Sequence, residues 1–356
     1  MASHARPTLA LVAARAGVSP STASLAFAGS PRVTDDTRRR VLEAAAQLGY
    51  PGPDPLAASL RRGRSGVVGV FIAERLRTAF RDPHAVVLMD GIAEVLGPHG
   101  VGLLLLAGDT TRPSPPQLGR IPLDAAIFAT CGSEDDPAME LLRNRGVPIV
   151  GVDGPVADGI TLIDINDREG TSEVATHLHG LGHRRAAIVA MPLRLDGTRG
   201  WVTPERRARI DYRDVRSRLD GVEDVFGPVP AYETASNVVD EGELAGIVLL
   251  DVPADRRPTA IFAQSDILAA GVLRAADRTG VRVPDDLSVV GFDGAELPWL
   301  SPTVLSTVVQ PTERKGQLAA SAVVELLAGR HPPSVTLPVT VRLGTTSGPS
   351  PVTVQP

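Results

Sequence analysis

The sequence has 356 residues but only one cysteine, and aromatic residues make up 3% of the chain. It contains no apolar run of the roughly 18 to 20 residues that a membrane-spanning helix needs, and its first residues lack a secretory signal. The single Cys131 excludes an internal disulfide and a metal site built from cysteines. We therefore expect a cytoplasmic protein without membrane contact, metal or cofactor.

The charge of the chain is unevenly distributed. Residues 1–65 contain nine arginines and four acidic residues, a net charge of +5, although the whole chain carries −5. The remainder therefore carries −10. A basic N-terminal segment on an acidic body favours contact of that segment alone with a polyanion such as DNA. The alternative is a local fluctuation in an arginine-rich protein.

Three short helices are predicted in the N-terminal segment. Thr8, Ser19 and Thr34 are N-cap residues, and Pro20 lies in the first turn of the second helix, where a missing N–H group is tolerated. Gly17 ends the first helix, and a tight turn leads directly into the second. This succession is the helix-turn-helix pattern, whose second helix enters the major groove of DNA.

Hydroxyl groups gather at the starts of the second and third helices. Helix N-termini and hydroxyl groups both bind phosphate oxygens, so the pattern predicts two clamps on the DNA backbone. The alternative is that Ser19 and Thr34 only cap their helices, but the exposed hydroxyls beside Ser19 have no capping role. The predicted DNA-binding hydroxyls are those of Thr8, Ser19, Ser21, Thr22, Ser24, Thr34 and Thr37.

From Gly66 onward, short apolar segments alternate with helical segments. The predicted strands contain VVGVFIA, VGLLLLAG, DAAIFAT, VPIVGVD, AAIVAM, GIVLLD, TAIFAQS and LSVVGFD, and the predicted helices include residues 82–96, 167–181, 266–280 and 312–329. Buried strands that alternate with helices are typical of parallel sheets covered on both faces. The body is therefore predicted to form two α/β lobes, followed by a disordered tail at residues 347–356.

The order and spacing of several segments resemble the lactose-repressor (LacI/GalR) family of transcription regulators. These segments are TLALVAARAGVSPSTASLAFAG, VTDDTRRRVLEAAAQLGY and PDPLAASLR near the N-terminus, and HLHGLGHRRAAIV, PTAIFAQSDILAAGVLRAADRTGVRVPDDLSVVGFDG and LSTVVQP in the body. The resemblance covers nearly the whole chain. It implies an α/β protein with an all-α helix-turn-helix head, a two-lobed body like a periplasmic binding protein with doubly wound parallel sheets, and a homodimer.

The resemblance also implies domain boundaries. The DNA-binding domain is expected at residues 1–50, a hinge at residues 51–65, and the effector-binding and dimerisation domain at residues 66–346. Lobe one is expected to comprise about 66–165 and 309–330. Lobe two is expected to comprise about 166–308 and 331–346.

In this family a hinge helix folds on DNA and inserts a leucine into the minor groove. The matching residue is Leu60, with Ala57 one turn earlier, and an apolar wedge of this kind kinks DNA. Packing of Leu60 in the core is the alternative. On the recognition helix, Pro20, Ser21 and Leu25 stand at base-reading positions, so few bidentate base contacts are expected. Specificity is expected to depend partly on DNA shape.

Polar residues follow several of the predicted strands of the body. Ligands of open α/β sheets bind beyond the carboxyl ends of the strands. Asp153, Ser265 and Asp293 stand at such ends, and the resemblance implies that they face the cleft together with Gln310 on a crossover. Carboxylates accept hydrogen bonds from sugar hydroxyls, so the predicted effector is a sugar. For any one aspartate, capping a helix is the alternative.

Further cleft residues are expected from the resemblance. The family usually has an arginine at the position of Ala208, and Arg207 or Arg209 is expected to replace it. Tyr232 is expected to contact an apolar sugar face, with ordinary packing as the alternative. Phe80 and His84 are expected to line the cleft.

No catalytic motif is present in the sequence. It contains neither a G-x-G-x-x-G segment after the first strand nor a P-loop. His179 and His183 have the spacing of a metal pair, but a capping role at a helix end is favoured. The chain is therefore not predicted to be an enzyme. The resemblance implies a dimeric repressor that binds double-stranded operator DNA and a small effector, and the polar cleft residues favour a sugar. The alternatives are a nucleoside or purine effector, or a sugar-binding transport protein.

Overall fold

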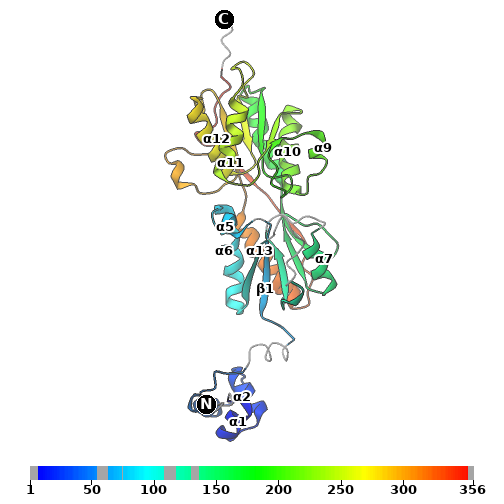
Figure 1. Ribbon diagram of the computed structural model, residues 1–356, viewed down its shortest axis with the longest axis vertical. Coiled ribbons are helices and arrows are strands. Elements are labelled where there is room, and N and C mark those ends of the chain that lie inside the picture. The colour runs from blue at the N-terminus through cyan, green and yellow to red at the C-terminus, as the bar shows by residue number, and fades with distance from the viewer. Residues whose placement is uncertain (1–6, 54–62, 74, 108–117, 130–135, 352–356) are drawn as a thin grey trace, which may run out of the picture. The chain divides into compact units, whose positions relative to one another are not determined.

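The computed structural model describes residues 7–53, 63–73, 75–107, 118–129 and 136–351. Two compact units are present, Met1–Gly66 and Val67–Pro356. We call them the head and the body and describe each by itself (Figure 1). The α/β class predicted from the sequence, with an all-α head and a two-lobed body, is confirmed.

The head consists of three helices, α1 (Leu9–Ala16), α2 (Pro20–Phe27) and α3 (Asp35–Leu48). The three predicted N-caps are confirmed, because the side chains of Thr8, Ser19 and Thr34 accept hydrogen bonds from backbone N–H groups three residues later. Gly17 ends α1 in the left-handed conformation that glycine adopts without strain. Small apolar side chains, among them Val12, Ala13, Ala23, Val41 and Ala45, form the core of the head.

The first lobe of the body is built on a parallel sheet in the order β12-β5-β4-β3-β1-β2. Its helix α13 packs against α6 (Figure 1). The strands are β1 (Val67–Ile72), β2 (Gly102–Ala107), β3 (Ala125–Phe128), β4 (Ile149–Val152), β5 (Thr161–Ile165) and β12 (Val335–Leu337), and the helices are α5 (Leu76–Ala79), α6 (Pro83–Leu96), η1 (Gly97–His99), η2 (Leu118–Arg120), α7 (Pro137–Asn144) and α13 (Thr312–Leu327).

The second lobe is built on a sheet in the order β13-β11-β10-β9-β6-β8-β7, parallel except for the two edge strands. The strands are β6 (Ala186–Ala190), β7 (Gly200–Trp201), β8 (Ala231–Glu233), β9 (Ala260–Ala263), β10 (Ser288–Asp293), β11 (Ser306–Val309) and β13 (Thr340–Arg342), and the helices are α8 (Asp167–Gly180), α9 (Pro204–Arg207), α10 (Arg213–Phe226), α11 (Val239–Leu250), α12 (Asp266–Thr279) and η3 (Pro298–Leu300). The chain crosses between the lobes after β5, β11 and β12.

One predicted strand is wrong: GIVLLD lies in helix α11. A short apolar run fits a buried helix as well as a strand. Two glycines of α11 allow α12 to approach closely, because a Cβ atom on Gly242 would lie 2.3 Å from the carbonyl oxygen of Leu268, and one on Gly246 would lie 2.6 Å from Ala275. The apolar run is therefore buried by helix packing.

Two boundaries in the C-terminal part differ from expectation. The family resemblance places residues 331–346 in lobe two, but β12 pairs with β5 and so extends the sheet of lobe one. The tail was expected to be disordered from residue 347, but Gly348 donates its N–H to Ser288 Oγ at 3.0 Å and Ser350 donates its N–H to the carbonyl of Leu181 at 3.0 Å. This segment thus lies bound along the second lobe.

Candidate functional site

The helix starts of the head carry paired hydroxyl groups. Ser19 Oγ accepts the N–H of Thr22 at 3.1 Å and is hydrogen-bonded to the Thr22 hydroxyl at 2.8 Å. Thr34 repeats the arrangement with Thr37, at 3.3 Å to the N–H and 3.0 Å between the hydroxyls. Ser19 and Thr34 are exposed. Each pair presents hydroxyl oxygens beside the positive end of a helix, where phosphate groups bind.

The other predicted DNA-binding residues lie as follows. Thr8, Pro20, Ser21 and Leu25 are exposed, whereas Ser24 is partly buried. Leu25 is 36% exposed on α2. The predicted hinge residues Ala57 and Leu60 lie outside the described residues, and their minor-groove role stays a prediction.

A cavity of about 420 Å³ lies between the two lobes of the body. It lies at the carboxyl ends of strands from both sheets, which is where open α/β sheets bind ligands. Its polar lining is rich in aspartate, and its apolar lining contains Met191, Leu195 and Val215. The polar and charged lining residues are Arg75, Thr78, Asp82, His84, Asp153, Tyr212, Asp214, Arg218, Ser236, Asn237 and Asp293.

Two strand-end aspartates, one from each lobe, meet at this cavity. Asp153 follows β4 and Asp293 ends β10, and both have positive φ angles, 59° and 120°. Such strained backbone is typical of functional sites. Burial raises the pKa of Asp153, against the opposing effect of Lys315, and raises the pKa of Asp293 well above its ordinary value. Both residues line the same cavity, and their contact with an effector stays a prediction.

Two of the aspartates that line the cavity each have one buried carboxylate oxygen without a hydrogen-bond partner among the described residues. These oxygens are Oδ1 of Asp153 and Oδ1 of Asp214, and both are buried. Buried acceptors without a partner are rare and costly. An ionised carboxylate only accepts hydrogen bonds, so these atoms require a ligand or solvent that donates them.

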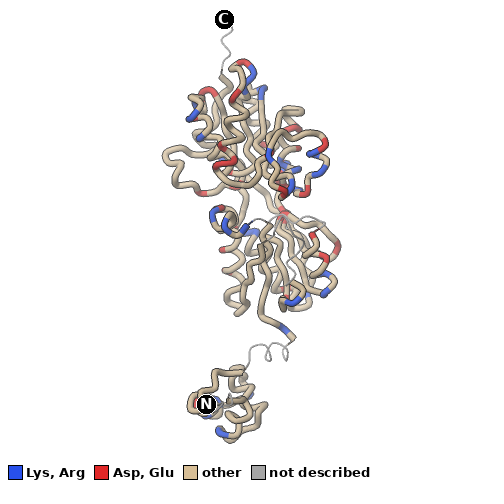
Figure 2. The backbone as a smooth tube through the Cα atoms, viewed as in Figure 1, with Lys and Arg blue, Asp and Glu red and all other residues tan. Residues whose placement is uncertain are grey.

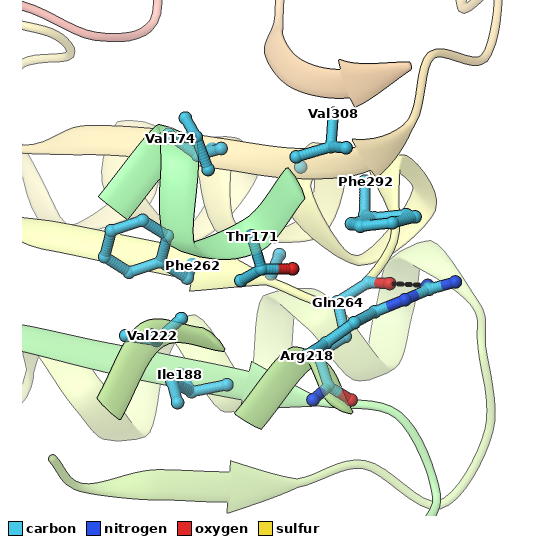
Figure 3. Close-up of a pocket in the computed structure, with 12 residues that line it drawn as sticks. Thr171, Val174, Ile188, Arg218, Val222, Phe262, Gln264, Phe292 and Val308 are labelled. Carbon is cyan, nitrogen blue, oxygen red and sulfur yellow. Dashed lines mark hydrogen bonds between the residues drawn. The ribbon is translucent and has the colours of Figure 1, made fainter. Parts of the chain in front are cut away.

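Arg218 of α10 contributes a buried guanidinium group to this site. Its Nε donates to Asp167 Oδ1 at 2.7 Å, and its Nη1 donates to the carbonyl oxygen of Gln264 at 2.6 Å (Figure 3). The guanidinium carbon lies 3.7 Å from the ring centre of Phe292, and Nη1 lies 3.9 Å from Asp293 Oδ1. The space beside these residues inside the lobe is only about 10 Å³, too small for an effector.

The structure does not bring the predicted Arg207 or Arg209 to the cavity. Arg207, at the end of α9, forms ion pairs with Asp220 at 2.6 Å and Glu223 at 2.7 Å on α10, and Arg209 is exposed. Acidic and basic residues alternate along the backbone around α9 and α10 (Figure 2), in agreement with these ion pairs. The buried arginine of the cavity lining is instead Arg218, which sequence reasoning missed.

A chain of hydrogen bonds joins the lobes on another side of the cavity. Asn237 Nδ2 of the second lobe donates to Asp82 Oδ2 of the first at 3.1 Å. The predicted Ser265 caps α12 and donates its hydroxyl to Asn237 Oδ1, so it acts on the cavity through Asn237. His84 Nδ1 lies 3.1 Å from Thr312 Oγ1. Burial lowers the pKa of His84 well below its ordinary value, which keeps the ring neutral.

Phe80 and Tyr232, also predicted at the cleft, are absent from the described residues that line this cavity. Phe80 is 62% exposed and borders a smaller apolar pocket beside α6. Tyr232 packs edge to face against Trp201, with ring centres 5.5 Å apart, which agrees with the packing alternative.

The described residues contain no cluster of histidine, cysteine, aspartate and glutamate that could hold a metal ion. His183 is buried and bonds Thr259 Oγ1 and the carbonyl of Gly348, each at 2.9 Å, so it anchors the C-terminal segment. Within the same described ranges, every helix is too short or too polar to cross a membrane.

Comparisons with known proteins cover both units. The family described as bacterial regulatory proteins, lacI family, matches residues 8–52, and the periplasmic binding protein-like domain matches residues 175–347. An HTH-type transcriptional regulator of Mycolicibacterium smegmatis is 34% identical, over 97% of this chain and 97% of that protein. The HTH-type transcriptional regulator IpsA of Corynebacterium glutamicum is 32% identical, over 96% and 98%. A solved transcriptional regulator CelR–cellobiose complex is 26% identical, with a TM-score of 0.66 over 96% of this chain and 100% of that chain.

Proposed function

Because the chain belongs to the LacI family of bacterial regulatory proteins and is a DNA-binding transcription regulator, we propose that it is a repressor controlled by a neutral, hydroxyl-rich effector. The effector, a sugar or related polyol, binds in the cavity between the lobes. The family membership confirms the resemblance seen in the sequence.

The observation that carries the proposal is the pair of unpartnered carboxylate oxygens on Asp153 and Asp214. A polyol supplies several O–H donors at close spacing, and each can satisfy one such acceptor. The side chains of Met191, Leu195 and Val215 provide the apolar surface that the C–H faces of a sugar ring require. A cavity of about 420 Å³ is within the usual range of small-molecule sites.

A nucleoside or purine is the weaker alternative. A nucleobase is usually stacked on aromatic rings, and Tyr212 and His84 are the only aromatic side chains among the described residues of the cavity lining. The solved CelR–cellobiose complex is a similar protein in complex with a sugar. A sugar-binding transport protein is not favoured, because such a protein has no use for a helix-turn-helix head.

A homodimer places two heads on one operator. In helix-turn-helix dimers the half-sites lie about one helical turn of DNA apart. Exposed apolar side chains of the first lobe support an interface through α6: Phe80 is 62% exposed, and Val86 and Val87 are 38% and 40% exposed. We assign residues 1–50 to DNA binding, 51–65 to a hinge and 66–346 to effector binding and dimerisation. Effector binding shifts operator affinity if it favours one arrangement of the lobes over another.

The test uses the purified full-length chain and a panel of cellobiose, glucose, ribose, adenosine and hypoxanthine. We expect at least one sugar, and neither purine compound, to raise the melting temperature and to release a genomic DNA fragment selected by the protein. Asp214→Asn should weaken that sugar about tenfold by loss of a charged acceptor. Asp224→Asn is the matched control, because Asp224 lies on the same helix and pairs with Arg168 at the surface. A response to adenosine or hypoxanthine alone would overturn the assignment.

A further inference from the structure

Lys315 is the only lysine in a chain that has 36 basic residues. It lies in the first turns of α13, directly after the crossover from β11, and none of its surface is exposed. Lysine is almost never fully buried without partners. A single lysine at a fully buried position beside the cavity therefore points to a specific role.

The contacts of Lys315 connect the two strand-end aspartates. Its Nζ donates to the carboxylate of Asp153 and, at 2.6 Å, to Oε1 of Gln310. Gln310 in turn donates from Nε2 to Asp293 Oδ1 at 2.7 Å. A continuous chain of hydrogen bonds thus runs from the end of β4 in lobe one to the end of β10 in lobe two. It occupies Oδ2 of Asp153 and leaves Oδ1 without a partner at the cavity.

The backbone that carries Lys315 is fixed by close helix packing. The next residue, Gly316, lies so near α6 that a Cβ atom there would be 2.2 Å from the carbonyl oxygen of Leu88. Gly91 of α6 approaches Glu313 equally closely. Because α13 cannot shift on α6 without a clash, the ammonium group is held at a defined place.

We propose that Lys315 is a positioning residue of the effector site, which holds Asp153 ionised with one oxygen turned to the ligand and, through Gln310, fixes the spacing of Asp153 and Asp293. The proposal rests on the proposed function for the identity of the ligand but not for the ionic role of Lys315. Lysine suits this role because its ammonium is a compact point charge, whereas the planar fork of arginine requires more space.

Several other titratable or charged groups lie around this pair and have to stay unchanged in the test. They are His84 from α6, Asp164 from β5, Asp167 from α8, Asp214 and Arg218 from α10, and Asp293 from β10. The comparison is therefore made between variants that differ only at positions 315 and 153. The matched control is Arg314→Met, because Arg314 is the exposed neighbour of Lys315 and contacts only Gln317 among the described hydrogen bonds.

The first measurement is urea unfolding of the full chain between about pH 5 and pH 8. Lys315→Met leaves Asp153 buried without its counter-charge, so the folded-state pKa of Asp153 rises further above the unfolded value. Stability from such a group is present at low pH and is lost as pH rises. We therefore expect the unfolding midpoint of Lys315→Met to fall with pH relative to that of Lys315→Met/Asp153→Asn, in which the charge is removed.

The second measurement is the affinity for cellobiose, glucose and ribose. We expect Lys315→Met/Asp153→Asn to fold but to bind the sugar recognised by the unmodified chain about tenfold more weakly, and Arg314→Met to bind it unchanged. A pH-independent stability loss in Lys315→Met, or full affinity in the double variant, would overturn the proposal. If no sugar binds the unmodified chain, the proposed function fails, and the pH measurement still decides whether Lys315 holds Asp153 ionised.

Discussion

The head and the body use polar side chains in different ways. In the head, the cap hydroxyls of Ser19 and Thr34 are exposed and bond within a single turn of their own helices. In the body, charged groups from distant parts of the chain, such as Asp153, Arg218 and Lys315, are buried together. Exposed groups bind a partner at little cost to folding, whereas buried charges make folding and ligand binding interdependent. This difference predicts where a substitution acts.

The largest expected effect is in the body. Arg218→Met removes the counter-charge of Asp167 and the donor to the Gln264 carbonyl, so a buried carboxylate is left unpaired. Such losses cost about 3–5 kcal/mol. We expect calorimetry of the full chain to show a lower melting temperature for the body and titration calorimetry to show no sugar binding. If the sugar affinity is unchanged in a folded variant, Arg218 does not belong to the site.

The burial of the Asp167–Arg218 ion pair makes the stability of the body depend on pH. Burial raises the pKa of Asp167 to about 6, although Arg218 opposes the rise. Because the folded-state pKa lies above the unfolded one, this carboxyl group contributes stability at low pH that is lost as pH rises from about 4 to 6. Asp167→Asn should flatten this part of the stability profile, as measured by urea unfolding between about pH 4 and pH 7. An unchanged profile would contradict the assignment of the titration to Asp167.

A smaller effect is expected in the head. Ser19→Ala removes the N-cap of α2, which typically costs about 1 kcal/mol, and also removes a predicted phosphate contact. We expect a lower melting temperature for the head and weaker binding of the selected DNA fragment, with the affinity for sugar unchanged. A loss of sugar affinity would show that the two units are not separable in this way.

The features that could be predicted from the sequence depend either on residues close in the chain or on a general rule of the fold. The caps at Thr8, Ser19 and Thr34 were predictable because N-cap side chains act within one helical turn. Asp153 and Asp293 were predictable because strand ends in parallel sheets gather at one edge. The alternation of strands and helices gave the body its class, except at α11, where an apolar run has no distinguishing period.

The missed residues depend on packing between distant segments. Arg218 was missed because the expected arginine lay near Ala208, on α9, whereas α10 is the helix that faces the cavity. The available signal was its position on the buried face of α10, one turn from Asp214 and Val222. Lys315 was missed because nothing in its neighbours shows that its side chain reaches Asp153, 162 positions away.

Within the head, Ser21 allows a DNA contact to be tested apart from the helix capping that Ser19 performs. Ser21 is exposed on α2, and its side chain makes no described hydrogen bond in the head. Ser21→Ala should therefore leave the melting temperature of the head unchanged, while binding of the selected DNA fragment weakens by up to about tenfold, as for a lost base-edge contact. If the variant were less stable but bound DNA with full affinity, Ser21 would stabilise the head and not contact DNA.

The smallest expected effect is that of Arg207→Gln, which tests whether charged side chains in the body matter in general or only at the cavity. Arg207 is partly exposed and pairs with Asp220 and Glu223 on α10, and such pairs contribute about 0–1 kcal/mol. We expect the melting temperature to fall slightly and the affinities for sugar and DNA to stay unchanged, with Arg218→Met measured alongside. Arg218 is part of α10, and Arg207 forms ion pairs with the same helix. An equal loss of sugar affinity in the two variants would therefore mean that the position of α10, and not the buried guanidinium of Arg218, determines binding.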